Sequence, residues 1–210
     1  MPNIIAPKGF VPSKTRTGGD WKGLVRTYYI PSSNATATFV GDVVVFNGAA
    51  GAAGFSLNGI DMEGVPEVVV ATSGTVTTGI AGVVVGFLPD QDNLMRKHRF
   101  ASTYRAVMVC PVENVIFAVQ EDADTTPVAA ASVGLNAAFT LTAGNATTGV
   151  SAFALDSSTV NTTATLPLRI LGLTKRVGNA LNTGGSLVDP AVFDVMFTGA
   201  HQMAAIPAGI

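Results

Sequence analysis

The chain has 210 residues and a formal net charge of −2; 48% of its residues are hydrophobic and only 12% are charged. The length allows one large domain or two small ones, and the negative net charge argues against general nucleic-acid binding, which typically shows as a strongly basic face. Because a freely soluble surface carries roughly a quarter to a third charged residues, the low charge suggests that a partner covers part of this one.

Residues 1–27 have the composition of an extended N-terminal arm. Prolines at positions 2, 7 and 12 and glycines at positions 9, 18, 19 and 23 interrupt any regular element, and the large apolar side chains are isolated. Such a segment cannot bury much of itself, so we expect it to order on another surface. Nothing in it resembles a signal peptide, which predicts synthesis and use in a cytoplasm.

The arm is basic, whereas the first half of the remaining chain is acidic. No Lys or Arg occurs between residues 27 and 95. We interpret the arm as lying along an acidic partner surface; a solvated basic tail is the alternative. Trp21 suits an interface anchor or, alternatively, a cap on the chain's own core. The arm carries one acid, Asp20, and five cations: Lys8, Lys14, Arg16, Lys22 and Arg26.

Residues 28–200 read as a body of short strands. Residues 28–46 predict a strand, a turn at 31–34 and a second strand interrupted at Gly41. Residues 104–109 and 115–119 are separated by a hairpin-length connection, so we expect them to pair. Only residues 128–133 favour a short helical turn. Further strands are expected at 65–71, 79–87, 137–141, 150–155, 166–173 and 191–197.

The fold class that follows is all-β: an antiparallel β-barrel or sandwich, jelly-roll-like, with an extended N-terminal arm and little helix. The organisation we expect is an arm at 1–27, a body at 28–200 and a tail at 201–210. The tail is apolar but too short to fold alone, so it also requires a partner. No apolar run approaches the ~18 residues of a membrane span, so we expect no membrane association.

The densest basic run is residues 96–99. Arg96, Lys97 and Arg99 follow Asp90 and Asp92, and they either pair with these acids in a solvated loop or contact an acidic partner. The two acids resemble the start of a calcium loop, but the required glycine and glutamate are absent. The acids of residues 121–124 can attract a metal, although carboxylates on one loop without a further constellation are more often a strand-end cap or a solvated turn.

No constellation of residues indicates catalysis. Cys110 is the single cysteine and lies in an apolar run, so we expect a buried structural thiol. His98 and His201 stand in unrelated contexts, and no Gly-X-Ser-X-Gly motif is present. We therefore expect no enzymatic activity, no cofactor and no metal site.

Several short motifs, taken in their order and spacing, resemble those of a known family. They lie at residues 6–12, 17–19, 28–33, 39–44, 82–87, 155–159 and 168–173. Together they span nearly the whole chain, and they are similar to the head decoration, or cement, proteins of tailed bacteriophages.

This resemblance implies a β-rich structural protein of the virion, on the capsid exterior. Such a protein binds the outer surface of the assembled major capsid protein lattice, bridges capsomers and stabilises the head against internal DNA pressure. The resemblance also implies a homo-oligomer, dimer or trimer, on local symmetry axes. It carries over no catalytic residues.

The contact residues are our own inference from the basic and apolar positions. Deletion of residues 1–26 is expected to abolish capsid binding and leave the body folded. The alternative functions are another virion structural subunit, of a tail or fibre, or a carbohydrate-binding β-sandwich, for which one tryptophan and three tyrosines offer few stacking platforms. The capsid-contact candidates are Lys8, Phe10, Lys14, Arg16, Trp21, Lys22, Arg26, Arg96, Lys97 and Arg99.

Overall fold

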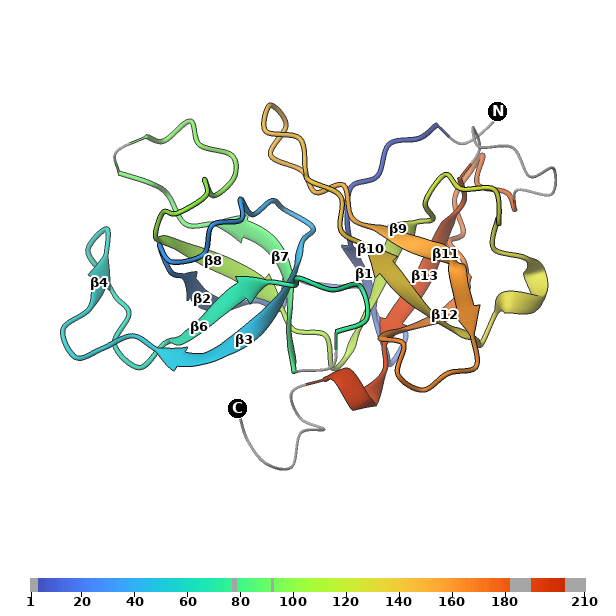
Figure 1. Cartoon of the computed structure of the whole chain (residues 1–210), viewed down its shortest axis with the longest axis horizontal. Coiled ribbons are helices and arrows are strands. Elements are labelled where there is room, and N and C mark those ends of the chain that lie inside the picture. Colours follow the sequence, from blue (N-terminus) through green and yellow to red (C-terminus); the bar gives the residue numbers. More distant parts are fainter. Residues whose placement is uncertain (1–3, 77–78, 92, 182–189, 203–210) are drawn as a thin grey trace.

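The computed structural model describes residues 4–76, 79–91, 93–181 and 190–202, and within them the chain is nearly all β (Figure 1). The all-β prediction is confirmed, including the near absence of helix. Two lobes lie side by side along the long axis. The elements are β1 Val11–Thr15, β2 Arg26–Ile30, β3 Val43–Ala50, β4 Ser56–Leu57, β5 Ile60–Asp61, β6 Pro66–Val70, β7 Ile80–Phe87, β8 Arg105–Cys110, β9 Val115–Gln120, η1 Ala130–Ser132, β10 Asn136–Thr140, β11 Ala154–Asn161, β12 Leu168–Leu173, β13 Val192–Phe197 and η2 Gly199–His201.

The first lobe is a closed barrel with the strand order β2-β6-β3-β7-β8. Its neighbours pair antiparallel, except for the parallel pair β2 and β6. The first five residues of β7 are all buried, as its apolar composition on both faces predicts. One face of β7 fills the barrel through Val84, and the other places Ile80 and Val83 in the core of the second lobe.

The second lobe is a six-stranded sheet with the order β1-β9-β13-β12-β10-β11. It curls until the last strand approaches the region of β9, where Glu121 and Leu155 form a parallel bridge. The concave side holds the largest hydrophobic cluster, to which phenylalanines 10, 117, 139, 153, 193 and 197 all belong. Because this cluster includes residues of β3 and β7, the two lobes share one core.

The expected hairpin of residues 104–109 and 115–119 is wrong. Both strands exist, but β8 pairs with β2 and β7 in the barrel, whereas β9 pairs with β1 and β13 in the second sheet. The connection at 111–114 crosses from one lobe to the other, with Val112 only 1% exposed. Closing the barrel requires β8 to pair with β2 as well as β7, so neither edge of β8 is free to pair with β9.

Residues 39–42 and 150–153 were expected to be strands, but they form a junction. Val40 and Val150 make an isolated parallel bridge, and the Gly41 amide donates to the Val84 carbonyl. β3 therefore begins at Val43 and β11 at Ala154. Gly41 has a φ of +101°, which only glycine adopts without strain. The helical turn expected near residue 130 is confirmed as η1.

The N-terminal segment, expected as an arm at residues 1–27, contacts the body through β1 and Phe10. β1 pairs with β9, and Phe10 is 1% exposed, with its ring edge-on to Phe117 and Phe139. Burying such a ring stabilises the fold more than leaving it for a partner. Deleting residues 1–26 would remove part of the core, so we no longer expect the remainder to stay folded. The tail from residue 203 lies outside the described residues.

Replacing Phe10 by alanine is expected to lower the free energy of unfolding by about 3–5 kcal/mol, the range for truncating a buried phenylalanine. The reason is the loss of ring contacts at the centre of the shared core. Urea denaturation measures the change. Val11→Ala is the matched control at the next position, where the side chain is 44% exposed, and it should cost less than about 1 kcal/mol. Equal costs would show that Phe10 does not pack as described.

Candidate functional site

The structure separates the ten capsid-contact candidates by exposure. Phe10 and Arg99 are buried, so they are corrected from contact residues to interior residues. Lys14, Trp21 and Arg96 are half-buried. The five that remain exposed are Lys8, Arg16, Lys22, Arg26 and Lys97.

Arg99 is a structural residue that ties barrel loops together. Its side chain is 1% exposed, and its guanidinium donates hydrogen bonds of 2.6–2.8 Å to four backbone carbonyls, those of Pro31, Asn34, Thr36 and Thr103. Burial lowers the pKa of Arg99 to about 10, so it remains charged at neutral pH. This role has no signal in the sequence, because three of the four acceptors are backbone atoms 63 to 68 residues away.

Arg99→Met is expected to destabilise the protein by about 3 kcal/mol, since it leaves buried carbonyls without donors. Arg99→Lys should recover only part of this loss, because one ammonium group with three donors cannot reach four carbonyls arranged around the edge of a planar guanidinium. Thermal and urea denaturation measure both. Lys97→Met, two residues away and exposed, is the control and should change stability by less than about 1 kcal/mol. If Arg99→Met matched this control, the structural role would be refuted.

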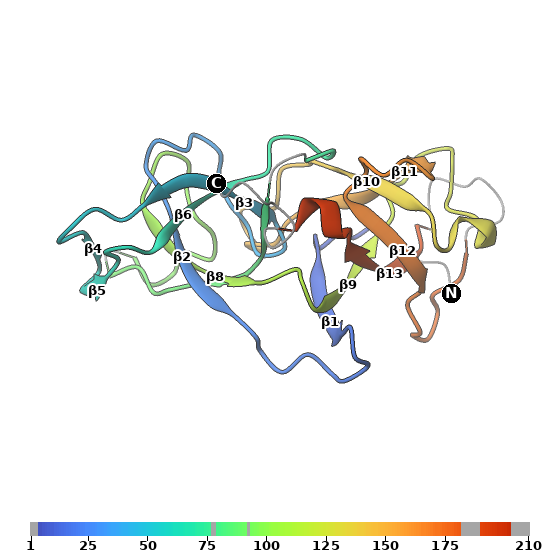
Figure 2. The ribbon, with the colours of Figure 1, turned by 90° about the horizontal axis from the view of Figure 1, so that it is seen from below.

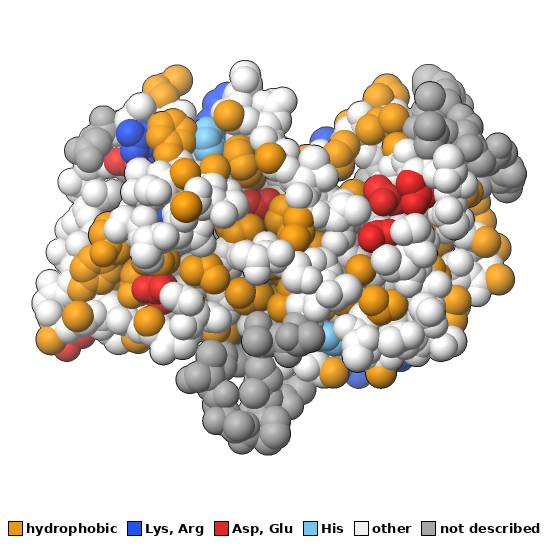
Figure 3. Space-filling model, viewed as in Figure 1, with side chains coloured by type: hydrophobic (Ala, Val, Ile, Leu, Met, Phe, Trp, Pro, Cys, Tyr) orange, Lys and Arg blue, Asp and Glu red, His pale blue; other side chains and the backbone are white. Residues whose placement is uncertain are grey.

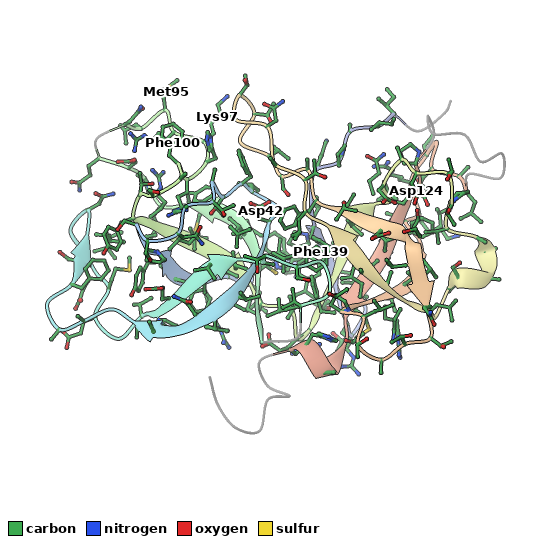
Figure 4. All side chains as sticks on the ribbon, in the orientation of Figure 1. Asp42, Met95, Lys97, Phe100, Asp124 and Phe139 are labelled. Carbon is green, nitrogen blue, oxygen red and sulfur yellow. The ribbon has the colours of Figure 1, made fainter. Side chains whose placement is uncertain are left out.

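The loop before β8 pairs internally through Arg96 and presents its tip to solvent. Arg96 makes an ion pair of 2.9 Å with Asp90 and lies 4.7 Å over the Phe100 ring. Lys97 donates to the Thr147 carbonyl at 3.3 Å. Met95, at the tip of this loop, is 82% exposed, and it lies with Lys97 at the same outer edge of the molecule (Figure 4). The sequence left two interpretations of the basic run, pairing with the nearby acids or contact with an acidic partner, and Arg96 follows the first by pairing with Asp90. Asp92 lies outside the described residues.

Trp21 and Cys110 meet at the edge of the core. Trp21 packs against the main hydrophobic cluster, which matches the interpretation of a cap on the chain's own core. Cys110 is fully buried, and burial raises the pKa of its thiol to about 12. The thiol therefore stays protonated at neutral pH, and the prediction of a buried cysteine is confirmed.

The histidines occupy packing positions. His98 is buried, with its ring stacked 4.8 Å from that of Phe39. His201 is also buried, and its Nδ1 lies 2.7 Å from the Thr198 hydroxyl. Burial lowers the pKa of both imidazoles, so both are mainly neutral at pH 7.

Three carboxylates from two segments converge on the second lobe. Asp122 and Asp124 follow β9 and Asp156 belongs to β11, and one oxygen of each lies within 4.8 Å of the others. Burial and the neighbouring acids raise the pKa of Asp122. The Ser157 hydroxyl lies 2.8 and 2.9 Å from the oxygens of Asp122 and Asp124. With one oxygen from each carboxylate, the group offers fewer ligands than the six to eight that Ca²⁺ takes.

Glu121, in contrast, is a strand-end cap. Its carboxylate accepts hydrogen bonds from the Val128 and Ala191 amides. This is one of the two explanations that the sequence left open for the acids of residues 121–124. The approach of Asp156 had no sequence signal, because it depends on how the sheet curls.

A groove of about 740 Å³ runs beside the N-terminal segment. Gln120 holds one wall: its amide accepts from the Ala6 N–H at 3.0 Å and donates to the Ile4 carbonyl at 2.9 Å. Lys8 and Arg176 bring two cations to the groove. The side chain of Val177 is fully exposed at its edge.

Asp42 lies at the junction of the lobes (Figure 4). It is 2% exposed; one carboxylate oxygen accepts from the Phe39 amide at 2.7 Å, and the other has no hydrogen-bond partner. Burial raises the pKa of Asp42 to about 6, against the opposing effects of the hydrogen bond from the Phe39 amide and of the nearby Ser151 hydroxyl. The charged form therefore destabilises the junction at neutral pH.

The stability of the protein is expected to rise as the pH falls from 7 towards 4 through this carboxyl. A folded-state pKa near 6, above the ordinary aspartate value of 3.8, means that the folded protein binds the proton more tightly, so the gain is complete below the unfolded pKa and is lost as the pH rises past 6. The difference corresponds to about 3 kcal/mol.

Urea denaturation of wild type and Asp42→Asn across this pH range measures the effect. The difference in stability between the two should vary with pH, because only wild type gains from protonation. Asp20→Asn, at an exposed position, should parallel wild type. A pH-independent difference for Asp42→Asn would contradict the assignment.

Comparison with protein family models, with curated proteins and with solved structures finds no match to this chain. Within the described residues, no helix is long and apolar enough to cross a membrane. Any function must therefore be argued from the surfaces described above.

Proposed function

We propose that this chain is a capsid decoration, or cement, protein that binds the outer surface of an assembled major capsid protein lattice. In this proposal it acts on the capsid exterior and bridges capsomers to stabilise a phage head. The observation that carries the proposal is a basic, partly apolar surface held in a fixed position on an all-β body. The resemblance in motif order supports the same function.

The anchoring of the N-terminal segment favours a rigid contact. Phe10 and Trp21 pack into the chain's own core, so the connection between β1 and β2 is fixed at both ends. Arg16, Lys22 and Arg26 lie in or beside this connection and remain exposed. A preformed surface loses less conformational entropy on binding than a disordered arm would, so the same contacts give a higher affinity.

A second exposed surface suits a bridging role. The loop before β8 carries Leu94 and Met95, which are 76% and 82% exposed, beside Lys97. It projects from the barrel, whereas the connection between β1 and β2 runs along a different side of the molecule (Figure 2). Two separated contacts let one chain engage neighbouring capsomers, and binding at the first then raises the effective concentration at the second. Dimers or trimers on local symmetry axes would multiply this gain.

The direct test uses empty heads assembled from the major capsid protein of the source virus. Purified full-length protein should sediment with the heads, saturate at a fixed number of copies per capsomer, and raise the temperature at which the heads disrupt. Electron microscopy of the saturated particles should show added density on the outer surface only.

Two outcomes would overturn the proposal. One is the absence of binding to heads at protein concentrations well above micromolar. The other is self-assembly into tubes or fibres without heads, which would favour a tail or fibre subunit. Binding to immobilised glycans without binding to heads would instead favour the carbohydrate-binding alternative.

A further inference from the structure

The solvent-facing side of the second sheet has an ordered arrangement of side chains. Residues of β9 and β13 alternate between buried and half-buried, so one face of the sheet looks outward. On that face Lys14 lies opposite Ile116, Met196 lies beside Ile116, and Arg169 lies opposite Met196. Directly opposed residues share a face. A row of side chains across β1, β9, β13 and β12 therefore consists of a cation, an aliphatic group, a thioether and a second cation.

Other cations border this row on two sides. The connection between β1 and β2 and residues 174–181, which follow β12, both run along the lower edge of the molecule in Figure 2. The face seen in Figure 3, in contrast, shows few Lys or Arg side chains and several acids. We define the basic face by its seven cations: Lys14, Arg16, Lys22, Arg26, Arg169, Lys175 and Arg176.

Among the described residues, few acids compensate these charges. Asp194 lies 3.6 Å from Lys14, and Asp20 sits in the connection itself. Glu113 is adjacent to Asn114, whose carbonyl accepts from the Arg16 amide. Within the part of the chain that the structure describes, seven cations against three carboxylates leave a local positive charge, in a protein whose total charge is −2.

We propose that the basic face binds an acidic protein surface. This inference deepens the proposed function, because under that function the acidic surface belongs to the capsid lattice. The charge provides complementarity, which increases the association rate and selects the partner. Exposed aliphatic side chains within the face, Leu24, Val25 and Leu171, are 52%, 40% and 37% exposed. An apolar centre with a charged rim is the usual composition of a protein interface.

The same residues fit a nucleic acid less well. Binding to single strands uses aromatic side chains as stacking platforms, but Trp21, the chain's single tryptophan, packs against the chain's own core. Closely spaced cations also favour binding to a phosphate backbone, whereas aliphatic side chains separate the cations of this face. The other occupant to consider is the acidic side of a second copy, which would give a head-to-tail contact that need not close.

The test measures binding of the full-length protein to immobilised poly-L-glutamate and to double-stranded DNA, by biolayer interferometry. The variant is Arg16→Ala/Lys22→Ala/Arg176→Ala, at three exposed positions whose side chains make no hydrogen bond or ion pair within the described residues. The matched control is Ala101→Glu/Thr142→Glu/Ala146→Glu, which reaches the same net charge through exposed loop positions away from the basic face. Circular dichroism confirms that both stay folded.

We expect wild type to bind poly-L-glutamate at about 20 mM salt and to lose most of this binding at about 200 mM, where screening is strong. The alanine variant should bind at least about tenfold more weakly, and the control should remain within about twofold of wild type. Equal loss in variant and control would overturn the basic face, because total charge would then explain the result. Preference for DNA, or sedimentation of wild type as long self-associated chains that the variant abolishes, would overturn the acidic protein partner.

This experiment also separates the inference from the proposed function. If the protein binds poly-L-glutamate through the basic face but does not bind heads, the inference of an acidic protein partner stands and only the capsid role is refuted. If the alanine variant binds heads as well as wild type does, the role of the basic face is refuted and the capsid role stands.

Discussion

The packing of Phe10 into the second lobe is the constraint on which the rest of the structure depends. Its ring meets Phe117, Phe139 and Phe197 at centroid distances of 6.4, 5.6 and 5.4 Å. It commits the N-terminal segment to the C-terminal half of the chain, so β1 becomes an edge of a sheet whose other strands begin 100 or more residues later. The barrel between them in sequence is thereby attached at both of its ends.

This attachment requires an unusually close backbone approach. A Cβ atom on Gly9 would lie 2.4 Å from the Gly41 carbonyl oxygen, and one on Gly41 would lie 2.4 Å from the Lys8 carbonyl oxygen. Both glycines also have positive φ. The Phe10 amide then donates to the Gly41 carbonyl at 3.0 Å. Two glycines with no side chains allow the N-terminal segment to contact the junction next to buried Asp42, where any larger residue would push the lobes apart.

The sequence identified the strands well because each is a short apolar run with β-branched residues. It failed where partners are chosen by the three-dimensional arrangement. The hairpin expected from β8 and β9 was a reasonable local inference from a short connection, but barrel closure gave the edge of β8 to β2. Prolines and glycines correctly indicated an irregular N-terminus, yet they concealed Phe10, since a single aromatic residue has no periodicity.

The candidate site could likewise be predicted from the sequence only in part. A count of Lys and Arg located basic segments, but it could not tell which cations are used internally. The Arg99 guanidinium is hydrogen-bonded to four backbone carbonyls. Arg96 and Arg105 both form ion pairs with Asp90, at nitrogen–oxygen distances of 2.9 and 2.8 Å. Arg169, which sequence reasoning did not select, proved to be exposed beside Met196. Its signal was present as a charged residue alternating with buried Leu168 and Ile170, a pattern that points a cation outward.

The internal use of the barrel's arginines makes the charge distribution more asymmetric than the net charge suggests. A guanidinium that is buried against carbonyls, or neutralised by a carboxylate, contributes little potential at the surface. Once three of the chain's twelve basic residues are used in this way, most of the remainder lie in the N-terminal segment and on the sheet of the second lobe. A weakly acidic protein can thus present one cationic side to a partner, and its acidic opposite side would orient it during the encounter. Such orientation matters most for a subunit that must dock on a repeating surface in a single pose.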